Sequence, residues 1–233
     1  MLTKFLSLFL VLTPAWGASI LQKAQLHDDC PEVHVFGARN TGTSQGFGLA
    51  GDFVNDIVQA TGATKEAIVY PANGNAGLTD PKYKASVQAG VKAVTSQVSK
   101  FAARCPQTKL VLVGYSQGSK LFDDALCGGG DPNMGISDTA ATISQFNIKA
   151  VLLPANDRFT PGEPFHVGNA TVGGFDKRPS NQVGCGKYND AIRLYCDIGD
   201  KYCSNGNSLK IHNGYHKVYG KAALEFVKKR LRA

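Results

Sequence analysis

The sequence lacks several features that mark other classes of protein. No Cys-x-x-Cys pair occurs among its six cysteines, which argues against zinc-binding and redox motifs. Beyond the N-terminal segment, no apolar run approaches the length that crosses a membrane. Internal repeats and low-complexity linkers are also missing. The chain of 233 residues, 43% of them hydrophobic, therefore suits one sizeable domain.

Positive charge exceeds negative charge in the chain. The 25 Lys and Arg and 18 Asp and Glu give a formal net charge of +7. Because the basic residues are dispersed, apart from the C-terminal run "VKKRLRA", we expect no nucleic acid as a partner. No membrane is expected as a partner either, and the protein is expected to be a monomer. The charge favours modest attraction to acidic cell-wall polymers.

The N-terminus has the pattern of a secretory signal. "MLTK" is a short basic region, "FLSLFLVLTPAW" is an apolar region too short to span a bilayer, and Ala15-Trp16-Gly17 is a small-x-small cleavage site. We therefore predict a signal peptide over 1–17, a short polar leader over 18–29 and a single domain over 30–233. The mature protein is expected to be secreted and extracellular.

The predicted secretion of the protein affects the interpretation of its six cysteines and of a glycosylation motif. In an oxidising compartment, the even set of six cysteines favours three disulfides. Six cysteines allow 15 pairings, and the spacing fixes only the local pair Cys196–Cys203. Asn169-Ala170-Thr171 is an N-glycosylation sequon, which is meaningful in an exported protein.

Strand-like and helix-like runs alternate from Cys30 onward. Short branched apolar runs predict buried strands at 32–38, 66–72, 109–115 and 149–155. Helices are expected at 48–60, 87–102, 117–126 and 215–231. This alternation predicts an α/β fold with a mainly parallel sheet covered by helices on both faces. The segment 156–190, rich in Gly, Pro and Asn, is expected to be a long irregular excursion held by a disulfide.

The stretch "LVLVGYSQGSKL", residues 110–121, places a serine between two glycines after a buried strand. Gly-x-Ser-x-Gly between a strand and a helix is typical of a nucleophile elbow, in which a strained backbone exposes the hydroxyl above the sheet. Glycines at 114 and 118 let neighbouring backbone approach without a Cβ clash. Ser116 is therefore predicted to be a nucleophile, and the alternative of a simple turn residue is disfavoured.

A serine nucleophile needs a general base and a carboxylate that orients this base. Three histidines follow the elbow, namely His166, His212 and His216. Spacing alone leaves the choice between His212 and His216 open. Among the carboxylates, Asp200 lies in the short loop that Cys196 and Cys203 would close, and Asp197 is its rival in the same loop.

Two motifs for other functions are weak. Gly46-Phe47-Gly48-Leu49-Ala50-Gly51 matches a dinucleotide-binding pattern, but it stands too far from the preceding strand and no acidic residue ends the second strand. His212 and His216 have the spacing of two metal ligands, yet Gly214 between them weakens a helix. We expect no metal ion and no cofactor.

Four stretches together carry a resemblance to a known family: "CPEVHVFGARNTGT", "GYSQGS", "ALCGGGDPNMGI" and "YCDIGDKYCSNGNSLKIHNGY". With these motifs in this order, the chain resembles the cutinase-like serine esterase family (carbohydrate esterase family 5), and most closely its fungal acetylxylan esterase branch. The resemblance covers nearly all of 30–233. It implies a small α/β-hydrolase with a five-stranded, mainly parallel sheet and no lid.

The resemblance also implies roles for individual residues. Position by position, it makes Ser116 the nucleophile, His212 the base and Asp200 the orienting carboxylate. The backbone N–H of Gln117, with the hydroxyl and N–H of Thr41, would form the oxyanion hole.

The family's disulfide pattern implies Cys30–Cys105 and Cys196–Cys203, which leaves Cys127–Cys185 as the third pair. The chain departs from the family after its fourth strand, where Pro154-Ala155-Asn156-Asp157-Arg158 replaces the Gly-Asp/Asn-Pro-Arg of many relatives.

The resemblance leaves the ester substrate open. The two stretches expected at the rim of the site, "SNGNSLKI" and "NGNAGLTDPK", are mostly polar, which favours a hydrated polysaccharide over a long acyl chain. Acetyl esters on xylan are therefore predicted, with cutin or a general short-chain ester as the alternative. A secreted wall-binding module without catalysis is disfavoured because Ser116, Asp200, His212 and Thr41 are all present.

Overall fold

The computed structural model describes residues 30–138 and 140–233, of which Pro31–Ala233 make up the unit that contains the sheet and its helices. The signal peptide and leader predicted from the sequence lie outside the described residues.

A parallel six-stranded sheet forms the centre of this unit, in the spatial order β2-β1-β3-β4-β6-β5. Its strands are β1 (Val33–Ala38), β2 (Thr64–Ala67), β3 (Lys109–Gly114), β4 (Ile148–Pro154), β5 (His166–Val167) and β6 (Ile192–Tyr195). The three central strands β1, β3 and β4 are buried along almost their whole length. Burial on both faces explains why their sequences are continuous apolar runs with no polar alternation.

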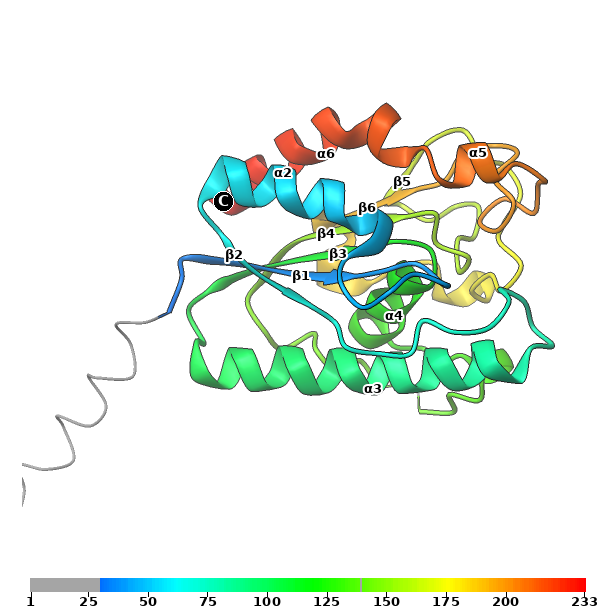
Figure 1. Ribbon diagram of the computed structural model, residues 1–233, viewed down its shortest axis with the longest axis horizontal. Coiled ribbons are helices and arrows are strands. Elements are labelled where there is room, and N and C mark those ends of the chain that lie inside the picture. The colour runs from blue at the N-terminus through cyan, green and yellow to red at the C-terminus, as the bar shows by residue number, and fades with distance from the viewer. Residues whose placement is uncertain (1–29, 139) are drawn as a thin grey trace, which may run out of the picture. The chain divides into compact units, whose positions relative to one another are not determined.

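Helices cover both faces of the sheet, as the sequence predicts. The α-helices are α2 (Gly51–Thr61), α3 (Pro81–Arg104), α4 (Gln117–Cys127), α5 (Leu209–His212) and α6 (Tyr215–Arg232). The described residues also form the short 3-10 helices η1 (Gly48–Ala50), η2 (Pro132–Met134), η3 (Ser180–Gln182) and η4 (Gly186–Ala191). Helices α2 and α6 pack together on one face, and α3 and α4 on the other (Figure 1).

The strand predictions need two corrections. The sheet has six strands where five are implied, because the irregular excursion contributes the two-residue edge strand β5. The strand predicted over 66–72 is wrong in extent, since β2 covers Thr64–Ala67. After β2 the chain leaves the ladder, so that Val69 is 64% exposed while Ile68 and Tyr70 are buried. The apolar residues of this stretch therefore pack from a loop and not from a strand.

The disulfides fasten segments on either side of β6, one before this strand begins and one after it ends. Cys127 at the end of α4 is bonded to Cys185, which holds the excursion 156–190. Cys196 is bonded to Cys203 and closes the loop after β6. Both pairs are the ones that the resemblance implies. Cys30 and Cys105 are disulfide-bonded as well, and the described residues include no free cysteine.

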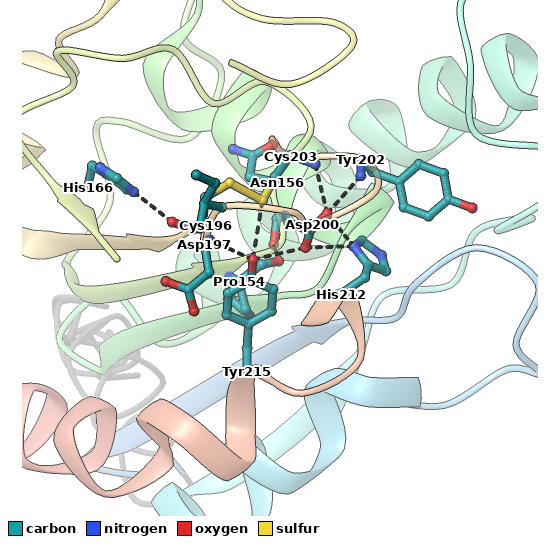
Figure 2. Close-up of a disulfide and its surroundings, with 12 residues drawn as sticks. Pro154, Asn156, His166, Cys196, Asp197, Asp200, Tyr202, Cys203, His212 and Tyr215 are labelled. Carbon is teal, nitrogen blue, oxygen red and sulfur yellow. Dashed lines mark hydrogen bonds and ion pairs between the residues drawn. A yellow bond between two sulfur atoms is a disulfide. The ribbon is translucent and has the colours of Figure 1, made fainter. Parts of the chain in front are cut away.

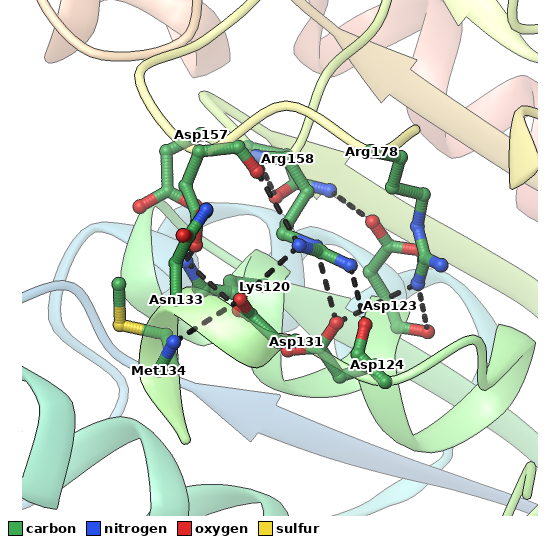
Figure 3. Close-up of polar contacts among 12 residues, drawn as sticks. Lys120, Asp123, Asp124, Asp131, Asn133, Met134, Asp157, Arg158 and Arg178 are labelled. Atoms are coloured by element: carbon green, nitrogen blue, oxygen red, sulfur yellow. Dashed lines mark hydrogen bonds and ion pairs between the residues drawn. The ribbon is translucent and has the colours of Figure 1, made fainter. Parts of the chain in front are cut away.

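A buried network of charges joins the excursion to α4 (Figure 3). We define the α4 charge network as eight side chains, none more than 6% exposed: Lys120, Asp123, Asp124, Asp131, Asp157, Arg158, Asp176 and Arg178. Arg178 donates to Asp123 at 2.9 Å, and the Arg158 guanidinium lies 3.2 Å from Asp124. Burial raises the pKa of Asp124 to about 7, although Arg158 opposes the shift. Because the segments that carry the network's other side chains pack against α4, residues Gln117–Leu126 of this helix are all buried.

Candidate active site

The carboxyl ends of β1 and β3 define the position of the site. These strands are neighbours, with Ala38 opposite Gly114, and the strand order reverses between them. Ligands of open α/β sheets bind at such a reversal, outside the carboxyl ends of the strands. Thr41 follows β1 and Ser116 follows β3, so the topology brings these two residues to the same place.

Ser116 sits in a strained turn between β3 and α4. Its backbone has φ +52° and ψ −118°, a conformation that is costly for a residue with a side chain. A Cβ on Gly114 would collide with the backbone of Ser119, and a Cβ on Gly118 with the carbonyl of Ala38. The two glycines therefore permit the close packing that holds Ser116 above the sheet, as expected of the elbow.

His212 and Asp200 complete a linked set with Ser116. The Nε2 atom of His212 lies 3.1 Å from the Ser116 Oγ atom, and its Nδ1 atom lies 3.0 Å from each carboxylate oxygen of Asp200. The Tyr115 hydroxyl donates to the backbone carbonyl of His212 at 2.6 Å, which fixes α5 next to the elbow. A serine, an imidazole and a buried carboxylate in this order have the geometry required for nucleophilic catalysis.

The structure separates the two candidate histidines. His216, in the first turn of α6, places its Nε2 atom 2.8 Å from the carboxylate of Asp56 in α2. Its ring packs edge-on against Phe53. His216 therefore joins α6 to α2 and does not contact Ser116. His166, the third candidate, hydrogen-bonds to the backbone carbonyl of Cys196.

Asp200 is held by several donors within the loop that the Cys196–Cys203 disulfide closes (Figure 2). Its Oδ1 atom accepts from the backbone N–H groups of Tyr202 and Cys203, and its Oδ2 atom accepts from the Tyr215 hydroxyl at 2.9 Å. Burial alone would raise the pKa of Asp200, but the hydrogen bonds from His212 and the backbone hold it below its usual value. The carboxylate is therefore ionised at neutral pH and fixes the His212 ring.

The rival carboxylate Asp197 is turned away from His212 (Figure 2). It accepts hydrogen bonds from the Tyr219 hydroxyl at 2.8 Å and from the backbone N–H of Asn169.

Thr41 and Gln117 place polar groups beside Ser116. The Thr41 Oγ1 atom is buried and has no hydrogen-bond partner among the described residues. Gln117 is the first residue of α4, so its backbone N–H has no intrahelical acceptor. The Ser86 hydroxyl donates to the Gln117 side-chain oxygen at 2.9 Å. Gly42 donates to the carbonyl of Ala72, which anchors the loop that carries Thr41.

A cavity of about 390 Å³ opens over these residues. Polar side chains form much of its wall, contributed by Asn40, Thr41, Asn75, Lys201, Tyr202 and Asn213, and its apolar side chains are Ala76 and Leu209. The Tyr202 ring stands edge-on to the His212 ring, with centroids 4.6 Å apart.

The described ranges, 30–138 and 140–233, contain no group of three or more His, Cys, Asp or Glu side chains suited to a metal ion. In the same part of the chain, none of the helices is long and apolar enough to cross a membrane.

Comparison with known proteins shows the family of this chain. The sequence profile of the family described as Cutinase matches residues 29–231. The chain belongs to the cutinase family. It is therefore a carboxylic ester hydrolase of the cutinase family. The chain is 46% identical to Cutinase 11 of Verticillium dahliae, over 87% of this chain and 70% of that protein. It is 44% identical to Acetylxylan esterase 2 of Talaromyces purpureogenus, over 87% of this chain and 88% of that protein.

A solved structure gives the same fold. The catalytic core domain of acetyl xylan esterase from Trichoderma reesei superimposes with a TM-score of 0.80 at 44% identity, over 87% of this chain and all of that domain. Relatives named as cutinase and as acetylxylan esterase thus match this cutinase-family esterase at similar identity.

Proposed function

We propose that this cutinase-family esterase is secreted and, as a monomer, removes acetyl groups from xylan. The polar side chains in the cavity wall carry the proposal, because their amide and hydroxyl groups can hydrogen-bond to a hydrated sugar. The relatives named acetylxylan esterase support it. Leu209, 48% exposed at the rim, and the 46% identical Cutinase 11 favour the alternative, a cutinase or general short-chain esterase.

In the proposed mechanism, the Ser116 Oγ atom attacks the ester carbonyl carbon while its proton passes to the Nε2 atom of His212. Asp200 stabilises the imidazolium ion that forms. The oxyanion of the tetrahedral intermediate accepts hydrogen bonds from Gln117 N–H and from Thr41. The intermediate collapses, the sugar hydroxyl leaves with the proton of His212, and the acetyl group remains on Ser116. Water, deprotonated by His212, then attacks the acyl-enzyme and releases acetate.

The Thr41 hydroxyl gives a direct test of the oxyanion hole. Because its Oγ1 atom is buried without a partner, it is free to donate to the oxyanion. We expect Thr41→Val, which keeps the shape and removes the hydroxyl, to lower kcat by about 10²–10³-fold with little change in KM. Thr41→Ser is the matched control and should retain most of the activity. Equal kcat values for the valine and serine variants would contradict this role.

Acyl-chain preference tests the proposed substrate class. Each methylene that found an apolar groove would gain about 0.8 kcal/mol, so a good groove would raise kcat/KM severalfold per carbon. Because Leu209 is the one large aliphatic side chain among the lining residues of the cavity, we expect kcat/KM for p-nitrophenyl esters to fall from acetate or butyrate toward octanoate, and acetate to be released from acetylated xylan. A steady rise to octanoate, with no acetate released from the polymer, would favour the cutinase alternative.

A further inference from the structure

The sequon asparagine Asn169 lies in the turn after β5, against the back of the Asp200 loop. Its side-chain Oδ1 atom accepts a hydrogen bond from the Ile198 N–H at 2.8 Å, and its own N–H donates to the carboxylate of Asp197. The Ala170 N–H donates to the carbonyl of Cys196, which aligns the two segments. The Asn169 side chain is therefore already oriented by the loop that it contacts.

The side-chain nitrogen of Asn169, Nδ2, is available for modification. The residue is exposed, and none of the described residues accepts a hydrogen bond from its Nδ2 atom. N-glycosylation forms the new bond at this nitrogen and leaves Oδ1 as an acceptor, so the Asn169–Ile198 hydrogen bond persists in the modified protein. Thr171, which completes the sequon, is exposed as well.

The residue whose N–H bonds the Asn169 side chain is apolar and exposed. This residue, Ile198, is 57% exposed. A large aliphatic side chain exposed to this extent gives a surface that the apolar face of a sugar ring can cover.

We propose that Asn169 carries an N-linked oligosaccharide whose first sugar packs on Ile198 and stabilises the back of the Asp200 loop. The neighbouring Asp197 points away from His212 (Figure 2), and Asn169 does not line the cavity over Ser116. The oligosaccharide is therefore placed where it leaves substrate access open. This inference rests on the secretion that is part of the proposed function.

The sugar itself is tested by expressing residues 18–233 in yeast behind a yeast secretion leader, so that entry to the secretory pathway does not depend on residues 1–17. The secreted protein and its Thr171→Ser variant are expected to lose mass on treatment with an endoglycosidase specific for N-linked chains. Thr171→Ala, which keeps Asn169 and its hydrogen bond to Ile198, is expected to show no such loss. Secreted protein without sugar at Asn169 would overturn the proposal, whatever its esterase activity.

The packing on Ile198 is tested with a double-mutant cycle. We expect Thr171→Ala to lower Tm by about 2–4 °C relative to Thr171→Ser, with kcat/KM for p-nitrophenyl acetate unchanged. Ile198→Ser should lower Tm by a similar amount in the glycosylated protein and have much less effect in the Thr171→Ala background. Equal effects of Ile198→Ser in both backgrounds would show that the sugar does not pack there and would overturn this part of the proposal.

Discussion

His212→Ala is expected to lower kcat for p-nitrophenyl acetate by about 10⁵–10⁶-fold, leaving only the residual catalysis of the oxyanion hole. The reason is geometric, because the His212 ring is the group that lies between the Ser116 hydroxyl and the Asp200 carboxylate. Without it, the serine has no base to take its proton and the leaving group has no acid. Steady-state kinetics on the folded variant, checked by circular dichroism, give the measurement.

His216→Ala is the matched control for this prediction. It removes the same side chain four positions further along, where the ring bonds Asp56 and packs against Phe53. We expect kcat within about threefold of the wild-type value and a small loss of stability, in the range of about 0.5–1.5 kcal/mol for one hydrogen bond. Near-normal turnover in His212→Ala together with inactivity of His216→Ala would reverse the assignment.

Lys120→Met is expected to lower the free energy of unfolding by about 3–5 kcal/mol. Lys120 is fully buried and is ion-paired with Asp176, with Asp131 at 3.2 Å and with Asp157 at 3.6 Å (Figure 3). Methionine fills a similar volume but leaves these carboxylates without their shared cation. Denaturant unfolding monitored by fluorescence gives the free energy.

Two further variants make this prediction specific. Lys100→Met changes the same residue type at an exposed position of α3 and should shift stability by no more than about 0.5 kcal/mol. In the Lys120→Met background, Asp176→Asn removes one of the uncompensated charges and should recover part of the loss. If the double variant were less stable than Lys120→Met alone, uncompensated charge would not be the cause.

The pH dependence of Lys120→Met has the same physical cause. Buried carboxylates without a cation have a pKa above that of the unfolded chain, so the folded state binds more protons than the unfolded state as pH falls. The stability deficit relative to wild type should therefore shrink as pH is lowered from 7 toward 4.5. A deficit that stayed constant over this range would point to lost packing and not to charge.

Several features of the site could be predicted from short stretches of sequence, because the physical requirement is local. The elbow around Ser116 needs glycine at 114 and 118, and the collisions that a Cβ would make at both positions give the reason. The loop of Asp200 is closed by cysteines only seven positions apart, which makes it recognisable from spacing.

Other parts of the site depended on contacts that no short stretch contains. Ser86 contacts Gln117 from α3, and the Tyr115 hydroxyl reaches the carbonyl of His212 across 97 positions. Neither Ser86 nor Tyr115 has a role that could be predicted from its neighbours in the sequence. Tyr215 is the last residue of the fourth stretch that carries the family resemblance, but its neighbours in the sequence do not indicate that its hydroxyl donates to Asp200.

The amino-acid pattern by itself determined the α/β class, the parallel central strands and the serine of the elbow, because each follows from burial or steric limits over a few residues. The spacing alone left the choice between His212 and His216 open, because they share a residue type and lie four positions apart, and only the family resemblance pointed to His212. In the tertiary structure, His212 contacts Ser116 and Asp200, whereas His216 contacts α2. The burial of the α4 charge network could not be predicted from the sequence either, because charged side chains normally indicate a solvated helix face. The excursion that folds over α4, together with Asp131 in the loop after α4, buries them and supplies their partners.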